Sequence, residues 1–167
     1  LITKIAGKWH FLITKRAQNI SYAGLWVLPG GKKDRSDPDL KHAALRELGE
    51  EIGASLSEAN IIKVLEYVDT PDGKYRIFPF LTVIDEPIEF KPNRAEVADE
   101  AWIPIDQVSA GRIVIKRGSE EIVLEFSKAN LKILTRFAAM VQAIVSNDFV
   151  SIGEEIDRAR NSTMSFL

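Results

Sequence analysis

Hydrophobic residues recur along the chain with two different spacings, one typical of strands and the other of helices. Residues 9–15, Trp-His-Phe-Leu-Ile-Thr-Lys, are rich in β-branched and aromatic side chains and predict a strand. Residues 25–28 predict a short strand that runs into Pro-Gly-Gly. Residues 61–68 and 75–84 predict two further strands, because the Asp-Thr-Pro-Asp-Gly-Lys segment between them is a strong turn signal.

The polar segment after Pro-Gly-Gly is followed by a predicted helix that begins at Asp37 and Pro38. Aspartate accepts hydrogen bonds from the free N–H groups of a helix start, and proline suits the first turn. Gly53 is well placed to end the helix, since glycine readily adopts the left-handed conformation found there. The stripe predicted to face the core consists of Leu40, Ala44 and Leu48.

The C-terminal third predicts a strand at 101–104 and a hairpin of 113–116 with 121–126 that turns at Gly118. An amphipathic helix is predicted over 128–146. The residues predicted to form its apolar side are Leu131, Leu134, Phe137, Met140 and Val141.

Strands and helices are interleaved along the chain, and tight turns join several of the strands. This order predicts an α/β fold in which helices flank a mixed β-sheet. At a length of 167 residues we expect a single domain over 1–167, with C-terminal helices over about 128–160. Ser151 and Glu154 resemble a capping box for the last of these helices.

Composition narrows the classes of function. The formal net charge is −2, so we expect no nucleic acid partner. No apolar run is long enough to span a bilayer and no signal peptide pattern is evident, so we expect no membrane partner. The absence of cysteine excludes thiol catalysis and fits a cytoplasmic location. His10 and His42 are too few and too isolated for a histidine metal site, and we expect surface or strand-packing roles for them.

Three glutamates in the first predicted helix carry the strongest chemical signal. Glu47, Glu50 and Glu51 stand at i, i+3 and i+4, which places their carboxylates on one patch of a helix. Like charges in one patch repel each other, so the arrangement makes sense if a cation neutralises them. Hard divalent cations prefer carboxylate oxygens, and we therefore predict a Mg²⁺ (or Mn²⁺) cofactor.

The segment at about 31–54 resembles the Nudix box, Gly-x5-Glu-x7-Arg-Glu-U-x-Glu-Glu-x-Gly-U, in which U is a bulky aliphatic residue. The first half departs from the pattern: Asp37 replaces glutamate after the five-residue gap, and eight residues rather than seven follow it. In the last position, Ala54 is smaller than usual. In the family the first glutamate mainly supports the loop, so we expect the departure to affect loop geometry more than catalysis. The matching residues are Arg46, Glu47, Leu48, Glu50, Glu51 and Gly53.

The resemblance covers roughly residues 8–145 and implies a Nudix-type α/β/α sandwich. It implies that Glu47, Glu50 and Glu51 are the metal-binding and catalytic set. It also implies that the carbonyl of Gly30 is a further metal ligand.

The resemblance extends to two other residues of the expected catalytic set. Arg46 would orient a glutamate through a charge-assisted hydrogen bond. One more acidic residue is common beyond the box, and we favour Glu96 over Glu100 because similar family members carry glutamate before the Trp-x-Pro strand.

Several residues near the glycine loop are candidates for substrate binding. The glycines permit close approach of a ligand to the main chain, and the basic side chains can meet phosphates. Trp26 and Phe80 could stack on a base, although core packing is the favoured role for both. The candidates for substrate binding are Arg16, Gly30, Gly31 and Lys32, with Lys15, Lys33 and Arg35 as further basic residues.

The resemblance implies Mg²⁺-dependent hydrolysis of a diphosphate linkage in a nucleoside diphosphate derivative, with water attacking phosphorus. Coenzyme A is the specific alternative substrate, because 70–79, 91–97 and the extended glycine loop resemble the coenzyme A diphosphatase branch. Residues 20–28 instead resemble the nucleoside triphosphate and general branches. A non-catalytic ligand sensor or regulator is the alternative of another class, and it usually shows a broken box. Homodimers are frequent in the family, so a second copy is an expected partner.

Overall fold

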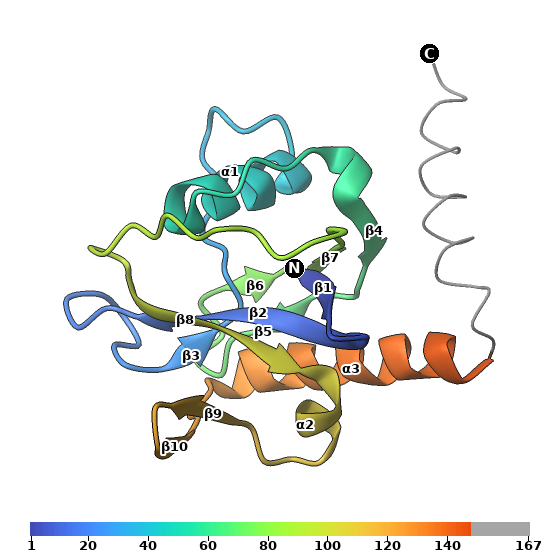
Figure 1. The fold of residues 1–167 in the computed structure, drawn as a ribbon. Helices are drawn as coiled ribbons and strands as arrows, with labels where there is room; N and C mark the ends of the chain where they lie inside the picture. Colours follow the sequence, from blue (N-terminus) through green and yellow to red (C-terminus); the bar gives the residue numbers. More distant parts are fainter. Residues whose placement is uncertain (148–167) are drawn as a thin grey trace.

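The computed structural model describes residues 1–147 of the chain and places strands between layers of helices (Figure 1). The helices are α1 (Leu40–Ile52), α2 (Ile105–Ser109) and α3 (Lys128–Asn147), with a short 3-10 helix η1 (Glu58–Asn60). The strands are β1 (Ile2–Ile5), β2 (Lys8–Arg16), β3 (Trp26–Val27), β4 (Ile61–Val64), β5 (Val68–Asp69), β6 (Arg76–Ile77), β7 (Phe80–Thr82), β8 (Val97–Pro104), β9 (Val114–Arg117) and β10 (Glu120–Val123).

β2 is the central strand of the largest sheet. β1 and β3 pair with successive parts of one edge of β2, and β8 pairs with the other edge. All of these pairs are antiparallel, and Leu12 of β2 stands opposite Trp102 of β8. β2 therefore links the N-terminal strands to β8, which follows the loop that carries Glu96.

The remaining strands form antiparallel pairs, β4 with β7, β5 with β6, and β9 with β10. Isolated parallel bridges join Ile2 to Val83 and Trp26 to Phe126. These bridges make the strand arrangement mixed, and the expected α/β/α fold with a mixed sheet is confirmed.

Side chains of β2 alternate between two hydrophobic clusters, as the two-residue period of a strand requires. Phe11 and Ile13 belong to the larger cluster, which also contains Leu134 and other residues of α3. Leu12 belongs to the second cluster with Ile52 and other residues of α1. Figure 1 accordingly shows α1 on one side of the strands, with α2 and α3 on the other.

The boundaries of α1 differ from the prediction at one end only. Asp39, not Asp37, is the N-cap, and its side chain accepts hydrogen bonds from the backbone N–H groups of Lys41 and His42. The prediction of Asp37 as the cap was wrong because that side chain is buried against Arg46 instead. Gly53 ends the helix in the left-handed conformation, as predicted, with φ of 73°.

The predicted apolar stripe is largely confirmed in α3 and only partly confirmed in α1. In α1, Leu48 is buried as predicted, whereas Leu40 is exposed and Ala44 is half-buried; the other buried apolar positions are Ala43 and Ile52. In α3, Leu131 is 42% exposed, whereas Leu134 and its neighbours are buried. The spacing rule therefore identified the buried face of α3 apart from its first residue, and in α1 it identified only Leu48 as buried. The buried residues of α3 are Ala129, Ile133, Leu134, Phe137, Ala138 and Val141.

The two strands predicted at 61–68 and 75–84 are each divided in the structure. β5 and β6 form a separate short hairpin, and Pro79, which lacks an N–H group, stands between β6 and β7. The hairpin of β9 and β10 is confirmed with a turn at Gly118. Ser151, Glu154 and the helix expected up to about 160 lie outside the described residues.

No helix within residues 1–147 is long and apolar enough to cross a membrane.

Gly53 has a second role that allows a sharp test. A Cβ at this position would lie 2.8 Å from the Cβ of Lys91, in the loop that leads to β8. Gly111 has the same φ of 73°, but a Cβ placed there would meet no atom within 4 Å, so it is a matched control. Gly111→Ala should cost about 1–2 kcal/mol for the left-handed backbone alone. Gly53→Ala should cost more, because Lys91 must also shift, and urea unfolding of both variants measures the difference. Equal losses would show that the Lys91 contact is unimportant.

Candidate active site

The glutamates singled out in the sequence lie on the second half of α1, beside the glycine loop that follows β3. The backbone N–H of Gly30 donates to Oε2 of Glu51 at 3.0 Å. On the other side of the loop, the N–H of Leu28 donates to Oδ1 of Asn130, in α3, at 2.8 Å. The loop is therefore held between the helix layers on both sides of the sheet.

The guanidinium group of Arg46 connects the glutamates to the loop. Its Nη1 donates to Oε1 of Glu47 at 3.1 Å and to Oε2 of Glu50 at 2.8 Å. Its Nη2 donates to the carbonyl oxygen of Lys32 at 2.9 Å. Charge-assisted bonds of this kind are roughly twice as strong as neutral ones, so Arg46 defines where two carboxylates and the loop lie.

Asp37 holds the other side of the same guanidinium. Its two carboxylate oxygens accept from Nε and Nη2 of Arg46 at 3.0 and 2.9 Å, and one also accepts from the N–H of Asp34 at 2.7 Å. The Arg46 hydrogen bond lowers the pKa of Asp37 to about 2. Sequence reasoning missed the pairing of Asp37 with Arg46, although the place of Asp37 after a five-residue gap from Gly31 was a signal for it.

Glu51 is the most deeply buried carboxylate of the group, with 4% of its surface exposed. Burial raises the pKa of Glu51 to about 7, against the opposing effect of the Gly30 hydrogen bond. The charges of Glu47 and Glu96 raise this pKa further, and the charge of Arg16 lowers it. Among residues 1–147, no lysine or arginine forms an ion pair with Glu51.

Glu47 lies against the main chain of the glycine loop. Burial raises the pKa of Glu47, while Arg46 opposes the shift and the charges of Glu50 and Glu96 reinforce it. A Cβ on Gly31 would overlap the carboxylate of Glu47, so only glycine permits this approach. Gly31 thus positions a carboxylate by leaving room for it.

The structure distinguishes the two candidates for an additional acidic residue. The loop before β8 is tied to the end of α1, since the N–H of Asn93 donates to the carbonyl oxygen of Glu51 at 2.9 Å. Glu96 follows in this loop, accepts from the side chain of Asn93, and is close enough to affect the pKa of Glu51. Glu100 instead forms a two-pronged ion pair with Arg94 at 2.7 and 3.1 Å. The site therefore brings Glu96, and not Glu100, toward the box carboxylates.

The other predicted binding residues surround this group. Arg16, at the end of β2, donates from Nε to the carbonyl oxygen of Ser21 at 2.7 Å, and its charge acts on Glu51. Lys32 extends from the loop to the ring of Tyr75. Trp26 is buried in the main core, and Phe80 is half-buried, so core packing accounts for Trp26.

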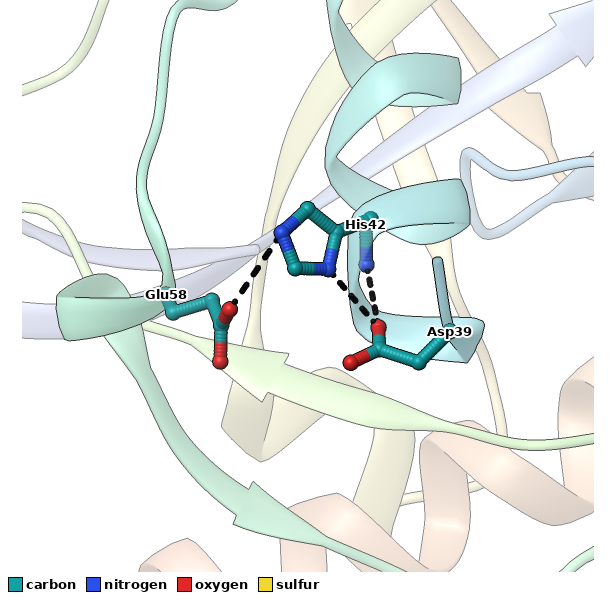
Figure 2. Close-up of side chains that lie close together, drawn as sticks. All are labelled: Asp39, His42 and Glu58. Atoms are coloured by element: carbon teal, nitrogen blue, oxygen red, sulfur yellow. Dashed lines mark hydrogen bonds and ion pairs between the residues drawn. The ribbon is translucent and has the colours of Figure 1, made fainter. Parts of the chain in front are cut away.

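A second group of potential metal ligands lies at the start of α1 (Figure 2). His42 lies between two carboxylates, with Nδ1 2.9 Å from Oδ1 of Asp39 and Nε2 3.5 Å from Oε1 of Glu58. The hydrogen bond to Asp39 raises the pKa of His42. All three side chains are exposed, and the same Asp39 oxygen already caps the helix. The group therefore ties α1 to η1, and His42 is exposed as expected although it is not isolated.

Comparison with known proteins identifies the relationship. The family model of the NUDIX domain matches residues 1–124. The chain belongs to the Nudix family. It is 31% identical over 100 residues to the Nudix hydrolase NudL of Pectobacterium atrosepticum, a match that covers 59% of this chain and 52% of that protein. The chain spans about half the length of such Nudix relatives, since NudL of Yersinia enterocolitica is likewise covered over 48% of its length, with 33% identity.

Solved Nudix structures share the fold. The NUDIX domain of Shewanella oneidensis NrtR, complexed with ADP ribose, superposes with a TM-score of 0.62 and 20% identity, over 85% of this chain and 82% of that chain. A MutT/nudix family protein from Enterococcus faecalis gives a TM-score of 0.63 and 21% identity, over 84% and 60% of the respective chains. Both likenesses establish the fold of this chain.

The carboxylates of the Nudix box suit a hard divalent cation. Glu51 is buried, carries two like-charged neighbours and forms no ion pair within the described residues, so a bound cation would relieve an unfavourable arrangement. Glu47 and Glu96, whose charges act on Glu51, supply further oxygen donors near it, and Glu50 adds another beside Glu47. This donor set matches the preference of Mg²⁺ or Mn²⁺ for carboxylate oxygens.

We expect Asp37→Asn to lower the melting temperature by about 5 °C or more, because the variant removes a buried charge opposite Arg46. Asp34→Asn is the matched control, since Asp34 is exposed and lies 4.0 Å from the same guanidinium. That control should change the melting temperature by less than about 2 °C. Similar losses in the two variants, measured by thermal unfolding, would contradict the anchoring role of Asp37.

Glu51 should make the metal-free protein less stable as pH rises. Its pKa in the folded protein, about 7, lies above the ordinary value of 4.5, so the fold favours the protonated form. The resulting stability is present below about pH 4.5 and is lost as pH rises through about 7. Glu51→Gln lacks this titration. At about pH 8, in the presence of a chelator, its free energy of unfolding should therefore exceed that of the wild type by up to about 3 kcal/mol. At about pH 4.5 the two proteins should have similar free energies of unfolding. Urea unfolding at both pH values measures this difference. If stability depended on pH in the same way in both proteins, the role assigned to Glu51 would be refuted.

Proposed function

We propose that the protein is a divalent metal-dependent Nudix hydrolase that cleaves a diphosphate linkage in a nucleoside diphosphate derivative. The observation that carries the proposal is the buried carboxylate of Glu51, crowded by Glu47 and Glu96 beside a glycine loop in a Nudix domain. Such a group has little structural value by itself, because its burial costs stability when it is ionised. The relatives named Nudix hydrolase support the same reaction class.

Glu47, Glu50, Glu51 and Glu96 would hold the metal, with the carbonyl of Gly30 as a further ligand. Bound Mg²⁺ or Mn²⁺ would neutralise phosphate oxygens and lower the pKa of a water molecule.

The chain's own residues would then orient the reactants. Arg46 fixes Glu47 and Glu50 through hydrogen bonds, so their lone pairs are preorganised for the cation. A carboxylate of the box, crowded by its like-charged neighbours, would accept a proton from the attacking water. Water attacks phosphorus, a new P–O bond forms, and the bond to the bridging oxygen breaks, leaving a phosphate group on each product.

Lys32 and Arg16 would meet the charged oxygens of the substrate. Lys32 follows Gly31 directly, and its main chain is fixed by Arg46, so its ammonium group can reach a diphosphate held by the glycine loop. Arg16 already acts electrostatically on Glu51 from the end of β2. Both residues belong to the substrate-binding set of this proposal, together with Gly30 and Gly31.

The substrate is proposed at the level of a nucleoside diphosphate derivative. ADP ribose is a reasonable first compound, since a Nudix domain of the same fold binds it. Coenzyme A is the specific alternative, because the segments at 70–79 and 91–97 resemble the branch that cleaves it. A ligand sensor without catalysis is less well supported, because the box glutamates and the arginine that orients them are all in place.

The decisive assay measures phosphate release with Mg²⁺ across nucleoside triphosphates, ADP ribose, dinucleoside polyphosphates and coenzyme A. An auxiliary phosphatase is added where a monophosphate is the product. Glu51→Gln keeps the size of the side chain and its hydrogen bond from Gly30 but removes the charge, so turnover should fall by about 10²- to 10⁴-fold. Chelation of the metal should abolish turnover of the wild type.

Glu120→Gln is the matched control, since this exposed glutamate lies on β10, at the opposite side of the strands from α1 (Figure 1). It should retain full turnover. Glu96→Gln should lose more activity than Glu100→Gln, because the charge of Glu96 acts on Glu51 whereas Glu100 is paired with Arg94. Full activity in Glu51→Gln would overturn the assignment of the site. Failure of the wild type both to bind Mg²⁺ and to turn over any compound would favour the sensor.

A further inference from the structure

An exposed tyrosine lies next to the glycine loop without contributing to the core. Tyr75 precedes β6 and is 45% exposed. Its position is well defined, because the N–H of Thr70 donates to the Tyr75 carbonyl at 2.9 Å and the N–H of Tyr75 donates to the Thr70 hydroxyl at 3.1 Å. A large aromatic surface is thus presented to solvent on a turn that is held rigidly.

Lys32 links this ring to the proposed active site. Its Nζ lies 4.8 Å from the centroid of the Tyr75 ring, a cation–π distance. At the other end of the same residue, the carbonyl oxygen accepts a hydrogen bond from Arg46 at 2.9 Å. The ring of Tyr75 therefore lies within one lysine side chain of the loop that contacts Glu51 and Glu47.

The ammonium group of Lys32 rests on the ring by a weak interaction. An exposed cation–π contact contributes far less than a charge-assisted hydrogen bond to phosphate. When a diphosphate lies at the glycine loop, Lys32 gains by turning from the ring to the phosphate oxygens, and only its side chain needs to move. That movement leaves a face of Tyr75 free beside the bound phosphates.

We propose that Lys32 and Tyr75 form a nucleoside subsite, in which Lys32 turns to the diphosphate and the Tyr75 ring stacks on the base. The inference rests on the proposed function, and it adds the part of the substrate that lies away from the reacting phosphorus. The ligand is the base of a nucleoside diphosphate, since its flat π-face matches the ring and its phosphates match the lysine.

Tyr67, on the same hairpin, provides the matched comparison. It is 46% exposed, nearly the same as Tyr75, but its ring is covered by the guanidinium of Arg76 at 3.8 Å and lies 6.0 Å from the ring of Phe78. Arg76 is in turn paired with Asp69 at 3.0 Å. Tyr67 thus belongs to a separate cluster that has no contact with Lys32 among the contacts of the described residues.

The test uses two ligands that cannot be hydrolysed and that differ only in the nucleoside. Calorimetric titration with α,β-methylene-ADP and with methylenediphosphonate, both with Mg²⁺, measures binding separately from turnover. Tyr75→Leu should lower the affinity for α,β-methylene-ADP by about tenfold or more and leave the affinity for methylenediphosphonate unchanged. Tyr75→Phe should bind as the wild type does, since stacking needs the ring and not the hydroxyl. Lys32→Ala should lower the affinity for both ligands, and Tyr67→Leu should change neither affinity.

Each result decides for or against the subsite. Equal affinity of the wild type for the two ligands, or an unchanged affinity of Tyr75→Leu for α,β-methylene-ADP, overturns the proposal. Equal losses in Tyr67→Leu and Tyr75→Leu also overturn it, because they would reflect the hairpin as a whole. Selective binding through Tyr75 in a protein that hydrolyses nothing supports the subsite and refutes only the proposed catalysis. If the protein hydrolyses nucleotides but Tyr75→Leu changes neither affinity, the proposed catalysis is supported and the subsite is refuted.

Discussion

The hydrogen bonds of Arg46 are the interaction on which the arrangement of the site depends. One guanidinium group contacts Asp37, Glu47, Glu50 and the carbonyl oxygen of Lys32. Without its positive charge, the carboxylates on α1 would repel each other more strongly in the metal-free protein. Without its planar array of donors, the end of the glycine loop at Lys32 would lose its hydrogen bond to the helix. The same residue thus limits electrostatic strain and sets geometry, and the position of Lys32 beside Tyr75 follows from it.

The layered fold supplies the second constraint. β2 alternates between two hydrophobic clusters, so α1 and α3 are fixed on opposite faces of the same strands. The glycine loop is attached to α1 through Glu51 and to α3 through Asn130. The loop before β8 is also joined to the end of α1, which brings Glu96 to the site from a distant part of the sequence. The carboxylates are therefore assembled by packing on both sides of the sheet.

Much of this arrangement could be predicted from the sequence, because the periodicity of strands and helices and the Nudix box are local patterns. The family and the α/β/α fold were confirmed. The hydrogen bonds of Asp37 to Arg46 and the contact of Lys32 with the Tyr75 ring were not predicted, since each depends on tertiary packing. Local rules favour aspartate before proline as a helix cap, and only tertiary packing against Arg46 overrides that preference. The catalytic roles of the box residues stay predictions.

The anchoring of Asp37 and Arg46 to each other has a consequence for how such proteins can be recognised. The guanidinium of Arg46 fixes the segment before α1 at two points, Lys32 and Asp37. The N-cap Asp39 then starts the helix independently of Arg46. Arg46 thus meets its acidic partner even though eight residues, one more than the family spacing, separate it from Asp37. A search pattern with rigid spacing would pass over chains of this kind, whereas one that asked for an acidic partner of the arginine would find them.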